Sequence, residues 1–216
     1  DTKLMQHQFV KSLPLMVQYF LSIAAWEVFF IYVEHLGKAE SALSQMYRSV
    51  FGIVGVGAWA LASTCNSMVS NLIGQQALSE VIPLIRRISG ISFLFAFLLG
   101  MPLLLFPSSF LHLLTSDTYL VETGVSSLRI VVVATWMLSV STIVFNGVAG
   151  TGSTRLNMWF ELTAIILYLL YNTLMIERWN YPLPYAWLSE FIYWFTLFAL
   201  SFWFFYTGRW KRSLVT

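Results

Sequence analysis

Residues 88–107 read ISGISFLFAFLLGMPLLLFP and contain no charged side chain. A helix needs about 20 apolar residues to cross the hydrocarbon core of a bilayer, so this stretch alone is long enough to do so. Comparable apolar stretches occur on both sides of it along the chain. Together they give six candidate spans, at about 12–34, 43–71, 88–107, 124–149, 158–177 and 185–206. The sequence therefore predicts an all-α polytopic membrane protein with six transmembrane helices.

The composition favours the same class. Only 10% of the 216 residues are charged and 58% are hydrophobic, whereas a soluble chain carries about 25% charged residues to cover its surface. The mean hydropathy of +0.72 agrees. The single cysteine, Cys65, excludes an internal disulfide, and a net charge of +2 with scattered basic residues does not indicate a nucleic-acid partner. The partner that the composition does predict is the lipid bilayer.

The distribution of lysine and arginine predicts the orientation, because cytoplasmic loops are enriched in both. With a cytoplasmic N-terminus, the outer loops hold only Lys38 and Arg178. The inner side then holds eight basic residues: Lys3, Lys11, Arg86, Arg87, Arg155, Arg209, Lys211 and Arg212. We therefore expect both termini to be cytoplasmic in a cell inner membrane, with residues 1–11 as a cytoplasmic or interfacial linker, 12–206 as the six-helix lobe and 207–216 as a basic tail. Because the chain begins with Asp1 and has no signal peptide, we interpret it as a fragment.

No catalytic motif is present. The chain lacks G-x-S-x-G, H-E-x-x-H and the phosphate-binding G-x-x-x-x-G-K-[ST]. Its three histidines fall at or beyond span ends, which argues against a serine–histidine pair or a metal site. The glycine-rich stretch 146–154, NGVAGTGST, has no lysine and follows a helix, so helix termination is its simplest interpretation. We expect no enzyme activity, no metal and no cofactor.

Charged residues inside spans are costly, so each is either paired or functional. Counted at 1.5 Å per residue from the outer ends, Glu27 lies about 10 Å deep, and Arg48, Arg129 and Glu190 lie about 8 Å deep. These two acids and two bases on four helices are predicted to line an outward-facing vestibule. Two roles stay open for Glu27: a site for the coupling cation, or a static ion pair with Arg48 or Arg129. In the first case Glu27→Gln abolishes ion-dependent transport and leaves the protein folded.

Polar residues mark further candidates. Pro14, Gln18 and Ser22 share one face of the first span, and Glu27 lies about 180° from Gln18 on a straight helix. Pro14 either bends that helix or begins it. The second span carries many hydroxyl and amide side chains with glycines between them, so either it lies inside the bundle or beside a wet cavity, or the glycines serve close packing.

The remaining polar residues are assigned less sharply. Asn66, Asn146 and Asn172 either line a cavity or bond between helices. For Glu161 we favour a surface pair with Arg155 over a site. The tryptophans and tyrosines near span ends are interpreted as interfacial anchors, with no aromatic ligand cage.

Several motifs in order resemble the C-terminal lobe of the multidrug and toxic compound extrusion (MATE) transporters. Residues 13–18 (LPLMVQ), with Trp26-Glu27 and 34–37 (EHLG), look like the seventh helix of that family. Residues 70–76 (SNLIGQQ) followed by Arg86-Arg87 look like the end of the eighth, and Thr115-Ser116-Asp117 looks like the turn between the ninth and tenth. Residues 146–154 resemble the end of the tenth.

The resemblance implies a twelve-helix transporter of two six-helix lobes that exports drugs or metabolites in exchange for Na⁺ or H⁺. This chain would supply one lobe, with the N-terminal lobe of the same transporter as its partner and a small, cationic or amphipathic compound as substrate. Gln18, Ser22, Glu27, Asn66, Asn146 and Asn172 would lie on the transport pathway. The family's acid in helix seven varies in position: Glu27 matches the later site, Ser22 stands at the earlier one, and Ser139 replaces an acid in helix ten. A lipid-linked oligosaccharide flippase and a non-transporting six-helix module are the alternatives. We expect the isolated lobe neither to transport nor to stay monodisperse in detergent.

Overall fold

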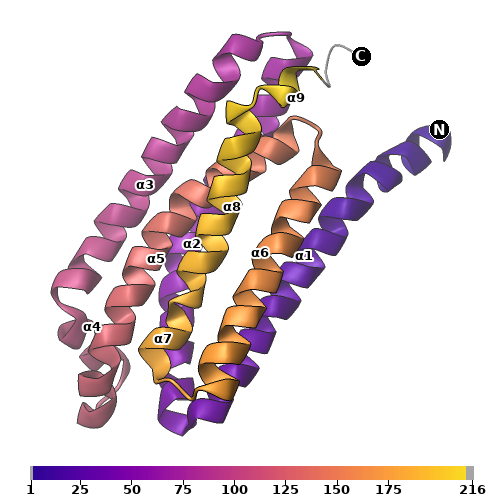
Figure 1. The fold of residues 1–216 in the computed structure, drawn as a ribbon. Coiled ribbons are helices and arrows are strands. Elements are labelled where there is room, and N and C mark those ends of the chain that lie inside the picture. The colour runs from indigo at the N-terminus through magenta and orange to yellow at the C-terminus, as the bar shows by residue number, and fades with distance from the viewer. Residues whose placement is uncertain (1, 213–216) are drawn as a thin grey trace.

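The computed structural model describes residues 2–212, and the side chains of 13–208, 210 and 211. Residue 1 of the expected linker and residues 213–216 of the expected tail lie outside the described residues. Every regular element in the described range is helical. The elements are α1 (Thr2–Leu36), α2 (Lys38–Gly74), η1 (Leu78–Glu80), α3 (Val81–Leu105), α4 (Pro107–Leu114), α5 (Thr118–Gly150), α6 (Thr154–Asn172), η2 (Thr173–Arg178), α7 (Leu183–Trp187), α8 (Ser189–Tyr206) and α9 (Arg209–Arg212). The long helices lie side by side in one elongated bundle (Figure 1).

Six of these helical segments are long and apolar enough to cross a membrane, which confirms the predicted all-α polytopic class. Their bounds are Leu13–Leu36, Lys38–Gly74, Leu78–Leu105, Thr118–Gly150, Thr154–Arg178 and Leu183–Tyr206. Most extend beyond the predicted ranges, because a helix continues past its apolar centre into polar residues. Arg86 and Arg87, expected in a loop, are exposed residues of α3 for this reason.

Short turns impose the up-and-down path. Only Gly37 separates α1 from α2, and its φ of 143° is a conformation that L side chains rarely adopt. At the start of α5, the Asp117 carboxylate accepts a hydrogen bond of 2.9 Å from the backbone N–H of Tyr119, as an N-cap residue does. After α5, Gly152 has a φ of 82°, which confirms that this glycine-rich stretch ends a helix.

The first and last described helices reach the same end of the bundle. In Figure 1 the start of α1 and the helix α9 lie at the same end as the α2–α3 and α5–α6 connections, and the other connections lie opposite. Arg86, Arg87 and Arg155 therefore lie near the termini, and Lys38 and Arg178 lie at the far end. This separation of basic residues agrees with the predicted topology.

Two apolar clusters fill the bundle. The first surrounds Trp187, near the end of the bundle opposite the termini, and the second includes Ile143, Leu197 and Phe204, nearer the termini. Tyr193 and Trp194 of α8 pack against both clusters, so they lie at the junction. The predicted last span is interrupted at Leu188, between α7 and α8. This break places Glu190 in the first turn of α8.

The polar side chains of α2 do not share one environment. Ser44 is buried and accepts a hydrogen bond of 3.2 Å from Trp187 Nε1, and Ser70 donates one of 2.9 Å to the Gly150 carbonyl of α5, whereas other hydroxyls face outward. Ser63, Thr64 and Ser67 are exposed, and the hydroxyls of Thr64 and Ser67 donate to α2 backbone carbonyls at 3.0 and 3.1 Å. The small residues do serve packing, because a Cβ at Gly57 would lie 2.2 Å from the Phe95 ring. The close-packing interpretation of the second span therefore fits, and the central position belongs to α5, whose apolar stretch is 67% buried.

Candidate functional site: an aromatic cavity with buried acids

A cavity of about 480 Å³ opens between α1, α2, α5, α6 and α8. Its wall contains the two charged side chains Arg48 and Glu190, together with the hydroxyl of Ser22. Aromatic rings form much of the remaining wall: Tyr19, Trp26, Phe51, Trp59, Tyr168, Tyr193 and Trp194. None of these rings belongs to the span-end residues that we interpreted as interfacial anchors, so the aromatic lining is a feature that the sequence interpretation did not cover.

Glu190 presents a buried carboxylate to this cavity. Its side chain is 2% exposed, and its two oxygens accept hydrogen bonds from Tyr168 Oη at 3.1 Å and from Trp194 Nε1 at 3.0 Å. Its position in the first turn of α8 also directs the positive end of the helix dipole toward it. All of these donors are neutral, and among the described side chains Glu190 forms no ion pair.

Glu161 of α6 is the second buried acid. It is 2% exposed and accepts a hydrogen bond from the Tyr193 hydroxyl, which also lies 3.1 Å from Ser22 Oγ. The expected surface pair with Arg155 is wrong, because Arg155 is exposed and lies six residues earlier, about 120° away around the helix. Glu161 instead shares the buried face of α6 with Asn157 and Tyr168.

Glu27 and Arg48 meet at the rim of the cavity. Arg48 donates a hydrogen bond of 2.7 Å to Glu27, and the two side chains are 43% and 51% exposed. The Arg48 guanidinium also lies 4.9 Å from the centre of the Phe30 ring. Of the two proposed ion pairs, the structure contains the one with Arg48.

Arg129 does not join the other three charges, which corrects the predicted four-residue cluster. It is exposed and does not line the cavity, whereas Leu138 of the same helix does. The two residues are nine positions apart, about 180° around the helix, so they face opposite directions. Counting depth along the helix gives no information about which face Arg129 occupies.

The first span behaves as its helical geometry predicts. Gln18 is buried and accepts a hydrogen bond of 3.1 Å from Asn157 Nδ2, whereas Glu27 is exposed. Pro14 lies inside α1, which begins at Thr2, so the interpretation of Pro14 as the helix start is wrong. Ser22 is the one predicted pathway residue whose side chain lines the cavity.

The three candidate asparagines do not line the cavity. The Nδ2 atoms of Asn146 and Asn172 donate to carbonyls of their own helices, at 2.9 Å to Thr142 and 3.0 Å to Tyr168. Asn66 is half-buried, and its backbone packs against Gly150 where α2 and α5 approach closely.

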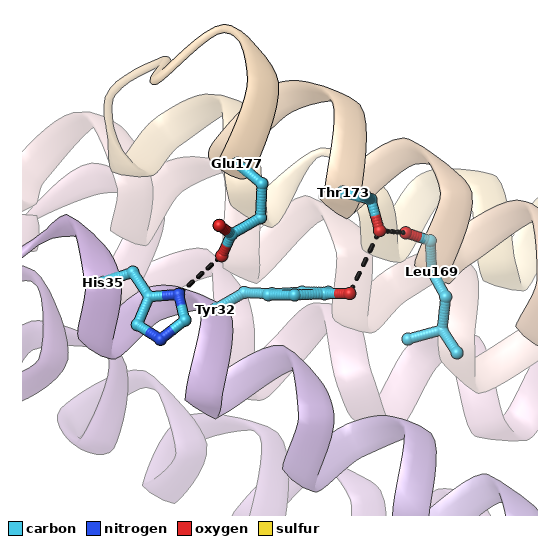
Figure 2. Close-up of polar contacts among 5 residues, drawn as sticks. All are labelled: Tyr32, His35, Leu169, Thr173 and Glu177. Atoms are coloured by element: carbon cyan, nitrogen blue, oxygen red, sulfur yellow. Dashed lines mark hydrogen bonds and ion pairs between the residues drawn. The ribbon is translucent and has the colours of Figure 1, made fainter.

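Polar contacts continue along the α1–α6 interface to the far end of the bundle, as Figure 2 shows. The hydroxyls of Tyr32 and Thr173 lie 3.0 Å apart, and His35 Nδ1 lies 2.5 Å from a carboxylate oxygen of Glu177. Thr173 and Glu177 belong to η2, a π-helical turn that extends α6. Beginning at Gln18–Asn157, this interface therefore carries polar contacts over most of its length.

Sequence reasoning missed Glu161, Tyr168, Tyr193 and Trp194. Two spacings in the sequence could have indicated the site. Tyr193 and Trp194 follow Glu190 by three and four residues, and Tyr168 follows Glu161 by seven. Both spacings put the residues on one helical face. An acid with aromatic donors on the same face is the pattern that indicates this kind of site.

Comparison with known proteins identifies the family. A family model described as MatE matches residues 14–174. The chain belongs to the MatE family. The matched range includes Glu27, Arg48, Glu161 and Tyr168, whereas Glu190, Tyr193 and Trp194 lie beyond it. A sequence comparison with curated proteins finds no match.

Solved structures share the MatE fold. An outward-facing conformation of a multidrug resistance MATE family transporter of the MOP superfamily matches with a TM-score of 0.71 and 15% identity, over 94% of this chain and 45% of that one. A MATE in complex with MaD3S matches with a TM-score of 0.67 and 17% identity, over 94% of this chain and 46% of that one. A MOP superfamily transporter from Pyrococcus furiosus Vc1 matches with a TM-score of 0.60 and 16% identity, over 90% of this chain and 43% of that one. That transporter is described as having a binding pocket of reverse polarity. The chain thus spans a little under half the length of each.

Proposed function

We propose that this MatE chain is one lobe of a secondary active transporter that exports small organic compounds in exchange for Na⁺ or H⁺ by alternating access. The solved MATE structures that it matches are about twice as long, which supports a second lobe as its partner. Transporters built from two repeats place the substrate site near the membrane midplane between them.

The cavity is the observation that carries this proposal. Its volume of about 480 Å³ lies in the range of small-molecule sites, and its wall is aromatic with one buried carboxylate, Glu190. The faces of aromatic rings attract cations, and a carboxylate adds a full negative charge. The substrate class that this chemistry suits is a cationic or amphipathic organic compound.

The membrane placement follows from the distribution of basic residues. The end of the bundle that holds both termini also holds Arg86, Arg87 and Arg155. The positive-inside tendency assigns that end to the cytoplasm. The transporter would then lie in the cell inner membrane and move its substrates outward.

A lipid-linked oligosaccharide flippase of the same superfamily remains the second candidate. Such a protein would be favoured by a wide basic cavity that receives an anionic diphosphate. Among the side chains that the structure describes, Arg48 is the one basic residue on the cavity wall, and Glu27 already pairs with it. The wall therefore supports the exporter over the flippase.

The test is dye flux by the full-length protein in sealed vesicles. A fluorescent organic cation is supplied under an imposed proton gradient, an imposed sodium gradient, or neither, with protein-free vesicles as the control. We expect flux above the control with at least one gradient and none without. Flux of no organic cation under either gradient would reject the exporter and favour the flippase or the non-transporting module.

A further inference from the structure

Glu161 is a buried acid to which the proposed exchange cycle assigns no role so far. It does not line the cavity; Tyr193, which does, donates its hydroxyl to the Glu161 carboxylate. The site thus lies one side chain behind the cavity wall, between α6 and α8.

The surroundings of Glu161 contain no compensating positive charge. Among the described side chains it forms no ion pair, and Tyr193, which donates a hydrogen bond to it, is neutral. A carboxylate that is 2% exposed in a membrane helix is costly unless a positive partner accompanies it. The site therefore calls for a ligand that brings positive charge.

A proton fits this site better than a metal cation. A sodium ion needs several oxygen ligands, and here the hydroxyls of Tyr193 and Ser22 are the neighbouring oxygens that hydrogen bonding connects to the carboxylate. Within the described part of the chain, no group of three or more histidine, cysteine or acidic side chains could hold a metal ion. A proton needs one carboxylate oxygen only.

A short hydroxyl relay connects Glu161 with the cavity. Ser22 and Tyr193 both line the cavity, and their oxygens lie 3.1 Å apart. A hydroxyl can accept one proton while it donates another. A proton that arrives at Ser22 Oγ is therefore balanced by one that Ser22 passes to Tyr193 and one that Tyr193 passes to Glu161. The carboxylate gains one proton, and both hydroxyls end the transfer protonated, because each receives one proton for the one that it gives.

We propose that Glu161 is the residue that binds the exchanged proton, loaded from the cavity through Ser22 and Tyr193. The inference rests on the proposed function and makes it specific. Tyr193 also packs against Tyr168, with ring centres 5.7 Å apart, and Tyr168 donates to Glu190 in the cavity wall. Proton binding at Glu161 changes the hydrogen bond of Tyr193 and so changes the wall that contacts the substrate.

The decisive experiment compares two fluxes of the organic cation by the full-length protein in vesicles. Gradient-driven flux is measured under an imposed pH difference, and dye-for-dye exchange is measured at equal pH. Glu161→Gln should lose the gradient-driven flux to the level of protein-free vesicles and keep the exchange. The exposed Glu177→Gln, as the matched control, should keep both.

Each alternative result has a distinct meaning. Wild-type protein that moves no dye under any gradient would overturn the proposed function and this inference with it. Active wild-type protein together with an unimpaired Glu161→Gln variant would overturn this inference alone. So would flux driven by sodium and unaffected by pH.

A second measurement keeps the test valid if Glu161→Gln fails to fold. A hydrophobic carbodiimide reacts with protonated carboxyl groups in apolar surroundings, and peptide mass spectrometry of the wild-type protein locates the adduct. We expect labelling of the Glu161 peptide that decreases as the pH rises. The Tyr193→Phe variant, which keeps the ring and removes the hydroxyl, should slow gradient-driven flux more than exchange. A Glu161 peptide that stays unlabelled at every pH would overturn the proposal.

Discussion

Acidic residues at the rim of the cavity and in the protein interior around it have opposite surroundings. At the rim, Glu27 is half-exposed and pairs with the guanidinium of Arg48. In the interior, Glu161 and Glu190 are buried and held by neutral tyrosine and tryptophan donors. An exposed ion pair contributes little to stability, whereas an unpaired buried acid is costly to keep. The contrast separates an acid that the fold holds at little cost from acids that weaken it when ionised, and it is one of the latter to which we assign the proposed proton exchange.

The largest expected effect on stability comes from removing the carboxyl group of Glu190. Glu190→Leu leaves the Tyr168 hydroxyl and the Trp194 N–H buried without an acceptor, at a cost of about 2–5 kcal/mol. Glu190→Gln keeps one acceptor oxygen and should cost clearly less. Thermal unfolding of the full-length variants in detergent checks the order. Equal midpoints for the leucine and glutamine variants would mean that these hydrogen bonds do not stabilise the interior.

The same contrast between interior and periphery applies to glycines, for which we expect an intermediate effect on stability. A Cβ at Gly150 would lie 2.7 Å from the backbone oxygen of Asn66, so Gly150→Ala should push α2 from α5 and cost about 1–3 kcal/mol. Gly90 is helical and exposed, with nothing within 4 Å of its Cβ position. Gly90→Ala should therefore be neutral or stabilising. Unfolding midpoints test the pair, and a harmless Gly150→Ala would show that the close contact is not required.

At the rim, a smaller effect is expected. Glu27→Gln breaks an ion pair whose side chains are 51% and 43% exposed, which is worth about 1 kcal/mol or less. The variant should fold with a nearly unchanged unfolding midpoint. A drop as large as that of Glu190→Leu would place Glu27 with the interior acids and remove the distinction.

The smallest effect belongs to the far end of the α1–η2 interface in Figure 2. His35 and Glu177 are more than a third exposed, so Glu177→Gln should change stability by about 0.5 kcal/mol at most. Its unfolding midpoint should match the wild type. A clear loss would indicate that the π-helical turn η2 depends on this contact.

The sequence was sufficient for the membrane fold and for the rim. Continuous apolar stretches predict spans regardless of tertiary contacts, and all six were confirmed. Depth along a helix follows from counting residues, which put Glu27, Arg48 and Glu190 near one level, and the Glu27–Arg48 pair was one of the stated alternatives. Counting residues for depth does not show which face of the helix a residue occupies. For this reason Arg129 was wrongly predicted to line the vestibule.

The interior could not be predicted because it depends on partners far along the chain. Glu161 meets Tyr193 across 32 residues, and Ser22 meets Tyr193 across 171. Reading α6 alone, a nearby Arg155 made a surface pair the simplest explanation for Glu161. The break between α7 and α8 was not predicted, so the position of Glu190 at a helix start was not foreseen.

Proton release on substrate binding tests the central claim most directly. The full-length protein in weakly buffered detergent solution is mixed with the organic cation, and a pH indicator records the protons released. The account predicts release by the wild type and by Glu177→Gln, and none by Glu161→Gln. Binding without proton release in the wild type, or equal release from Glu161→Gln, would contradict it.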